Sequence, residues 1–129
     1  MEAPTVTIGT ETVTLCKPGT TGAIALARSD EDRKTDGHEI GIIYGAAALR
    51  MCWPEDAAWP VLMRPLKWRP GVPMAVYGAE VLDGLGNGDI DVVGMLPALQ
   101  VAYDWAITSR LLQAEVRAAE DFSAPPPGA

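Results

Sequence analysis

Three side chains in this chain could supply a cysteine–histidine pair for nucleophilic catalysis: Cys16, Cys52 and the single histidine, His38. Such a nucleophile needs the imidazole within hydrogen-bonding distance. Cys52 lies far beyond His38 on the same predicted helix, which separates the two by about 21 Å at a rise of about 1.5 Å per residue. Cys16 could reach His38, but no sequence typical of a cysteine hydrolase flanks either residue. We therefore expect two ordinary core cysteines and a histidine at a helix start.

Metal and phosphate sites have no better candidates. A structural zinc site needs ligands at spacings such as CxxC or HxxxH, and the chain contains neither. The acidic run 30–32 lacks the glycine and the distal glutamate of a calcium-binding loop. The sequence GLGNG at 84–88 follows a predicted helix rather than a strand, so a turn is a better interpretation than a phosphate cradle. Carboxylates are plentiful, but no catalytic pair stands out. We predict a protein that is not an enzyme and needs no cofactor or metal.

A different kind of site is suggested by tryptophan and methionine around a proline-rich segment. Residues 54–73 contain five prolines, and three of the four tryptophans lie in or beside this segment. A segment of this length without regular structure is usually functional or ordered by packing. Methionine adapts to irregular partners, and tryptophan is enriched at binding anchors. The predicted partner-binding residues are Met51, Trp53, Trp59, Met63, Leu66, Trp68 and Met74. The alternative is that they form a small core beneath the loop.

The charge pattern favours a protein as the partner. The formal net charge is −7, which argues against binding nucleic acid through its phosphates and against binding an anionic membrane surface. Arg64, Lys67 and Arg69 nevertheless surround Trp68. This basic cluster could contact an acidic segment of a partner, or it could be solvated loop charge.

Length and composition are those of one soluble domain. The chain has 129 residues, of which 48% are hydrophobic, and this is enough for a substantial core. Two distant cysteines form no disulfide framework, so a reducing cytoplasm is the simplest compartment. The N-terminus lacks the basic and apolar regions of a signal peptide. The longest apolar run, 40–49, is too short to span a bilayer.

The elements that would position these residues are organised around the stretch 91–112. Apolar residues recur there at helical spacing on more than one side, so we expect a helix that is covered from several directions. Pro97 lies inside this stretch, and proline removes a helical hydrogen bond and clashes with the preceding turn. Either the helix kinks at Pro97, or a short helix ends near Gly94 and a longer one starts at Pro97.

The remaining segments predict a hairpin and several helices. Apolar and polar residues alternate over 5–16 on both sides of a glycine, which predicts a β-hairpin. A lone hairpin is marginal, so it must lie on the helices or pair with another copy of the chain. Gly37, Gly41 and Gly45 recur every four residues in the predicted helix 36–53, where they would let another backbone approach closely. Further helices are expected at 20–28, 73–85 and 113–122.

These elements predict an α+β fold with an N-terminal β-hairpin followed by four or five helices. We expect one globular domain over residues 1–122 and a disordered, proline-rich tail at 123–129. The free hairpin edge and the generous apolar surface would also allow a homo-oligomer.

This order of elements resembles the tail assembly chaperones of long-tailed bacteriophages. The segments that carry the resemblance are VTIGTETVTLCKPGT, AVYGAEVLDGLGNGDIDVVGMLPALQVAYDWA and AEVRAAEDFSAP. The tryptophan- and proline-rich segment 53–73 is not part of it. The resemblance implies a non-catalytic protein of the host cytoplasm that binds apolar helical segments of the tape measure protein and helps to recruit tail tube subunits. Two other classes stay open: a head–tail connector or other virion subunit, and a small inhibitor or adaptor that binds a host protein.

Replacing Leu99 by aspartate tests the placement of the central helix. A carboxylate buried without a partner costs several kcal/mol, so we expect the Leu99→Asp variant to be unfolded, with no cooperative thermal transition by circular dichroism. A soluble variant with the wild-type melting temperature would mean that Leu99 does not lie in the core.

Overall fold

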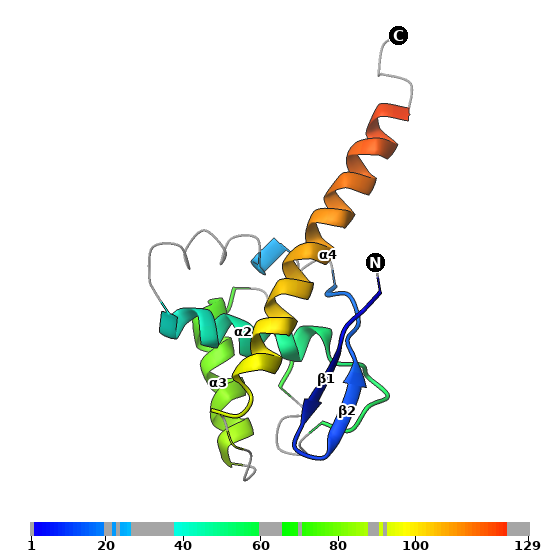
Figure 1. The fold of residues 1–129 in the computed structure, drawn as a ribbon. Coiled ribbons are helices and arrows are strands. Elements are labelled where there is room, and N and C mark those ends of the chain that lie inside the picture. The colour runs from blue at the N-terminus through cyan, green and yellow to red at the C-terminus, as the bar shows by residue number, and fades with distance from the viewer. Residues whose placement is uncertain are drawn as a thin grey trace.

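The fold is a two-stranded hairpin followed by helices (Figure 1). The computed structural model describes residues 2–19, 22, 24–26, 38–59, 66–69, 71–87, 91 and 93–123. Its elements are β1 (Thr5–Ile8), β2 (Glu11–Thr14), α2 (His38–Cys52), α3 (Met74–Asn87) and α4 (Leu96–Ser123). Residues 22 and 24–26 are also helical. The predicted α+β fold is therefore confirmed. The first two residues of the predicted helix 36–53 and all but the first residue of the predicted tail lie outside the described residues.

The hairpin forms for the reasons that its sequence suggests. Strands β1 and β2 are antiparallel, with Val6 opposite Val13 and Ile8 opposite Glu11. Gly9 begins the connecting turn with a φ of 60°, a conformation that glycine adopts without steric cost. The apolar side chains on one face are buried, whereas the threonines of the two strands are exposed. The hairpin thus offers one apolar face to the rest of the protein.

This face lies on the helices, and Cys16 is the point of attachment. The Cys16 amide donates a hydrogen bond of 2.7 Å to the carbonyl oxygen of Cys52, the last residue of α2. The indole Nε1 of Trp105, in α4, donates to the Cys16 carbonyl oxygen at 2.9 Å. The end of the hairpin, α2 and α4 therefore meet at Cys16. The sequence allowed the hairpin either to lie on the helices or to pair with another copy of the chain. The structure shows the first arrangement.

Helix α2 lies between α3 and α4 and contacts both. Residues 44–49 of α2 are all buried. Gly45 faces α4, where an added Cβ atom would lie 3.1 Å from both the Cβ atom and the carbonyl oxygen of Leu99. The expected close approach of another backbone is therefore confirmed at Gly45. Leu99 itself is 2% exposed, in agreement with its predicted place in the core.

Helix α3 approaches α2 even more closely, at a glycine that the sequence did not single out. A Cβ atom added to Gly78 would collide with the carbonyl oxygen and the Cγ2 atom of Ile43 in α2. The helix also continues further than predicted. Residues 84–87 are helical, so the predicted turn at 84–88 is wrong in its described part.

Helix α4 begins at Leu96, with Pro97 in its first turn. Proline is well tolerated there, because the first amide groups of a helix have no helical acceptor. Residues 93–95 form a turn. Just before this turn, the Asp91 side chain accepts a hydrogen bond of 3.1 Å from the Val93 amide. Pro97 therefore marks a helix start, preceded by a turn rather than by a short helix.

From Leu96 the helix runs without interruption to Ser123. The separate helix predicted at 113–122 is thus the end of α4, and Ser123 belongs to the helix rather than to the tail. Figure 1 shows this C-terminal part of α4 extending past the other elements. Part of the apolar surface predicted for its first half is buried, whereas Leu96 and Val101 are exposed; the buried residues are Leu99, Ala102, Tyr103, Trp105 and Ala106.

Replacing Gly78 by alanine tests the contact between α2 and α3. Alanine normally stabilises an exposed helix relative to glycine, by up to about 1 kcal/mol. Here the added methyl group meets backbone that cannot turn away, so we expect a loss of about 1–3 kcal/mol in the free energy of unfolding, measured by denaturant titration. Gly19→Ala is the control, because nothing lies within 4 Å of an added Cβ there. Equal effects of the two changes would contradict the close packing at Gly78.

Candidate functional site

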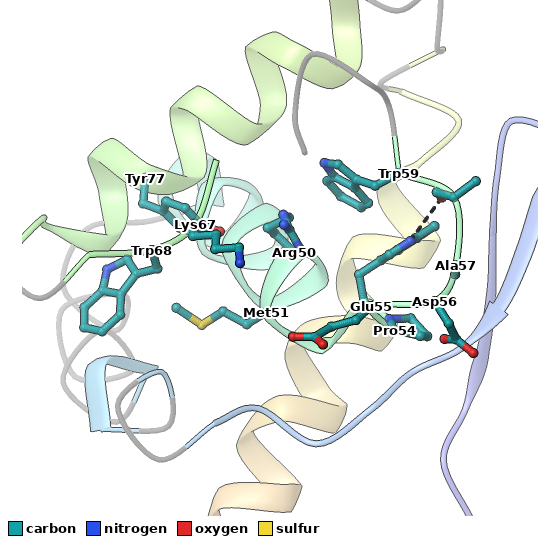
Figure 2. A pocket seen from close by; sticks show the side chains of 12 residues that line it. Arg50, Met51, Pro54, Glu55, Asp56, Ala57, Trp59, Lys67, Trp68 and Tyr77 are labelled. Carbon is teal, nitrogen blue, oxygen red and sulfur yellow. Dashed lines mark hydrogen bonds between the residues drawn. The ribbon is translucent and has the colours of Figure 1, made fainter. Parts of the chain in front are cut away.

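A cavity of about 820 Å³ opens at the C-terminal end of α2. Its sides come from the end of α2, from the segment that follows it and from residues just before and within α3 (Figure 2). The lining residues are Arg50, Met51, Trp53, Pro54, Glu55, Asp56, Ala57, Ala58, Trp59, Lys67, Trp68 and Tyr77. We call this the tryptophan cavity, after its three indole rings.

Two of these indoles form a rigid pair. The rings of Trp53 and Trp59 pack edge to face, with centroids 4.7 Å apart and an angle of 70° between the ring planes. The Trp53 Nε1 donates a hydrogen bond of 3.2 Å to the Ala58 carbonyl oxygen, drawn as a dashed line in Figure 2. The segment turns back after Pro54, whose carbonyl oxygen accepts from the Ala57 amide at 3.2 Å. Short local bonds therefore hold this side of the cavity in place.

Arg50 connects the two sides of the cavity. Its guanidinium carbon lies 5.2 Å from the centroid of the Trp59 ring, within the range of a cation–π contact. Its Nε donates to the Leu66 carbonyl oxygen at 3.2 Å. One half-buried side chain of α2 thus contacts both Trp59 and Leu66, which lie seven positions apart in the sequence. A positive charge is also held against the aromatic lining.

The far side is formed by Trp68 and Tyr77. The Trp68 Nε1 donates to the Val72 carbonyl oxygen at 3.2 Å, which fixes the indole while leaving its ring half-buried. Burial raises the pKa of the Tyr77 phenol to about 12. The nearby Arg50 charge and a backbone hydrogen bond from Trp68 act against this rise, and Glu80 adds to it.

Charged and polar groups complete the lining. Figure 2 shows Arg50 and Lys67 in the middle of the lining, with Glu55 and Asp56 along its edge. The buried Nε1 of Trp59 has no hydrogen-bond partner among the residues that the structure describes. The cavity therefore combines apolar surface with two cations and two carboxylates, an arrangement suited to a ligand with both an apolar and a charged part.

The structure brings together four of the seven predicted partner-binding residues. Met51, Trp53, Trp59 and Trp68 line the cavity. Trp53 and Trp59 are each 5% exposed and Met74 is 7% exposed, so these three also belong to the core, as the alternative interpretation proposed. Leu66 is half-buried, and Met63 lies outside the described residues. Partner binding by this set stays a prediction, with Met51 and Trp68 offering the most surface.

Sequence reasoning missed Arg50 and Tyr77. Arg50 is the one charged residue in the apolar run from Ile40 to Trp53. A long charged side chain on an otherwise apolar helix end was a signal that could have pointed to it. Tyr77 lies in the predicted helix 73–85, and its low exposure of 2% makes it a core residue. Nothing in its neighbours in sequence indicated that it would also border a cavity.

The basic cluster is only partly described. Lys67 and Arg69 are exposed, and Lys67 lines the cavity. Arg64 lies outside the described residues. The interpretation of this cluster as a contact for acidic groups stays a prediction.

The structure agrees with the expectation from the sequence for one cysteine and differs for the other. Cys52 is fully buried, but Cys16 is exposed, so the expectation of two core cysteines is wrong for Cys16. Its backbone joins the hairpin to the helices while its side chain stays near the surface. Within the described ranges, no group of three His, Cys, Asp or Glu residues is placed to hold a metal ion. Nor is any described helix long and apolar enough to cross a membrane.

Comparison of the chain with models of protein families, with curated proteins and with solved structures finds no match. The function must therefore be argued from the cavity and from the order of the elements.

The raised pKa of Tyr77 makes a prediction about stability at high pH. The folded pKa of about 12 exceeds the ordinary value of 10.0, so folding favours the neutral phenol. Its contribution is fully present below pH 10 and is lost as the pH rises towards 12. Cys52, whose pKa burial raises to about 12, loses its contribution in an overlapping range.

A comparison of the wild type with Tyr77→Phe separates the two groups. We consider the free energy of unfolding of the wild type minus that of Tyr77→Phe, each measured by denaturant titration. This difference should be constant below pH 10 and should decrease between about pH 10 and 12. The Cys52 effect cancels, because both proteins contain it. A difference that does not change with pH would show that Tyr77 titrates normally.

Proposed function

We propose that this chain is a non-enzymatic protein-binding module of the tail assembly chaperone type. In this proposal, the tryptophan cavity receives apolar side chains from a helical segment of a phage tail protein, with the tape measure protein as the main partner and the tail tube protein as a second. The observation that carries the proposal is the open cavity of about 820 Å³ lined by three tryptophans and a methionine.

The lining has the properties of a docking site for side chains. Tryptophans dominate the energy of protein interfaces, and a flexible methionine adapts to different apolar shapes. Trp53 and Trp59 are buried and held by their mutual packing, so they form a fixed base beneath the more exposed side chains of the lining. Met51 and Trp68 are only half-buried and can gain contacts with a partner.

The cations restrict the kind of partner. Arg50 and Lys67 contribute positive charge to a chain whose net charge is −7. An apolar helix with a carboxylate one turn from its anchoring residue would match both parts of the lining, since opposite charges fix the orientation of a docked segment. An entirely apolar helix would match only the apolar part of the lining. We therefore propose an amphipathic helix with acidic residues as the ligand.

The fold provides further support through its element order and its surface. A hairpin followed by helices is the arrangement on which the resemblance to tail assembly chaperones rests. Large apolar side chains are also exposed outside the cavity: Ile24, Val76, Val93, Leu96 and Val101. Exposed apolar surface of this kind is common at sites of protein interaction, although single residues are normal on any protein.

Co-purification with the tape measure protein encoded in the same genome tests the proposal. We expect the wild-type chain to bind it, and Met51→Ala and Trp68→Ala each to weaken binding by at least about tenfold, as loss of an interface anchor does. Affinity is measured by titration calorimetry, and the melting temperature is measured in parallel. Val101→Ala is the matched control, because Val101 is an exposed apolar residue on α4 that does not line the cavity.

Three outcomes would count against the proposal. Unchanged affinity of the Met51 and Trp68 variants would exclude the cavity as the docking site. An equal loss in Val101→Ala would point to the α4 surface instead. Presence of the chain in purified virions, without binding to free tape measure protein, would favour a structural subunit. Trp53→Ala is a poor probe, because removing a buried aromatic ring costs about 3–5 kcal/mol of stability.

A further inference from the structure

The two cysteines, far apart in sequence, lie side by side in the fold. The Cys16 amide donates a hydrogen bond of 2.7 Å to the Cys52 carbonyl oxygen. Disulfide bonds join residues whose Cα atoms lie about 4.4–6.8 Å apart, so only residues with neighbouring backbones can be bridged. The direct backbone hydrogen bond makes Cys16 and Cys52 neighbours of this kind.

The environments of the two thiols differ. Burial is the main cause of the raised pKa of Cys52, and the Cys16 thiol is the second cause. Cys16 is exposed to solvent, whereas Cys52 is fully buried. The chain contains no other cysteine. An oxidant from solution can reach only Cys16, and the nearest thiol to it is Cys52.

We propose that Cys16 and Cys52 form a redox site in which a reversible intramolecular disulfide bond links the hairpin to α2. This inference is independent of the proposed function. The oxidant is a small disulfide, such as oxidised glutathione. The Cys16 thiolate attacks one of its sulfur atoms, the S–S bond breaks, and one glutathione leaves as a thiolate. Cys16 then carries a mixed disulfide.

The second step uses the buried thiol. Cys52 loses its proton and attacks the Cys16 sulfur, and the second glutathione leaves as a thiolate that takes up a proton. Two protein thiols are oxidised, and one small disulfide is reduced to two thiols. Because burial keeps Cys52 protonated at neutral pH, the first attack belongs to Cys16. A reducing dithiol reverses both steps.

The position of the bond gives it a structural effect. Cys16 follows β2, and Cys52 ends α2 immediately before Trp53 of the tryptophan cavity. Trp105 of α4 already donates to the Cys16 carbonyl oxygen. Oxidation would therefore fix the hairpin and the end of α2 to one another at the edge of the cavity, where the reduced protein has only hydrogen bonds and packing.

The test uses the full chain, first reduced and then incubated with oxidised glutathione. In the native reduced protein we expect N-ethylmaleimide to label Cys16 alone. After oxidation we expect no labelled cysteine, a mass lower by two hydrogens, a monomer on non-reducing electrophoresis and a peptide that links the two cysteines. The melting temperature should rise by roughly 10 °C and return on adding dithiothreitol, as expected for closing a loop of this length.

Cys16→Ser is the control, because this side chain is exposed and the exchange should leave the fold intact. The variant should melt like the reduced wild type and show no response to oxidised glutathione. Two results would overturn the proposal. One is a stable glutathione adduct on Cys16 while Cys52 remains a thiol. The other is a dimer linked through Cys16 of two chains.

Discussion

Helix α2 can lie between two other helices because a side chain is missing at each point of closest approach. Gly45 lets the backbone of α4 come within contact distance at Leu99, and Gly78 of α3 leaves room for the Ile43 carbonyl group. Larger residues at either position would move the helices apart. The small residues 46–48 of α2, all alanine and all buried, maintain the same close spacing.

The contacts made by the C-terminal end of α2 depend on the place of this helix between α3 and α4. Within a few residues, the helix supplies Arg50 to the tryptophan cavity, the Cys52 carbonyl oxygen to the hairpin and Trp53 to the aromatic pair. The end of α2 is therefore shared by the hairpin and the cavity. A shift of α2 relative to its neighbours would change both at once.

Local sequence patterns predicted the parts of the fold that depend mainly on residues close together in the chain. The alternation over 5–16 predicted the hairpin, and the helical spacing after Pro97 predicted the buried face of α4. The glycine spacing predicted a close contact that Gly45 makes. In contrast, nothing local distinguishes Gly78 from a tolerated glycine, because its role depends on Ile43 of another helix.

The same difference between local patterns and tertiary contacts explains why only part of the candidate site could be predicted. Tryptophan, methionine and proline around 51–74 indicated the region of the cavity, since these residue types suit a packed or binding loop. They could not indicate which side chains would be buried, because that depends on how the loop folds back on α2. Arg50 lies half-buried against Trp59, and this contact, rather than a local propensity, places its positive charge in the cavity.

The hydrogen bond between Trp105 and Cys16 has a consequence for biosynthesis, since it joins residues 89 positions apart. The hairpin is synthesised before α4, yet part of its apolar face is covered by that helix. Until α4 is made, the valines, isoleucine and leucine of the hairpin cannot pack against it. The hairpin therefore cannot complete its packing until α4 has been synthesised, and any factor that binds its apolar face before then must release it.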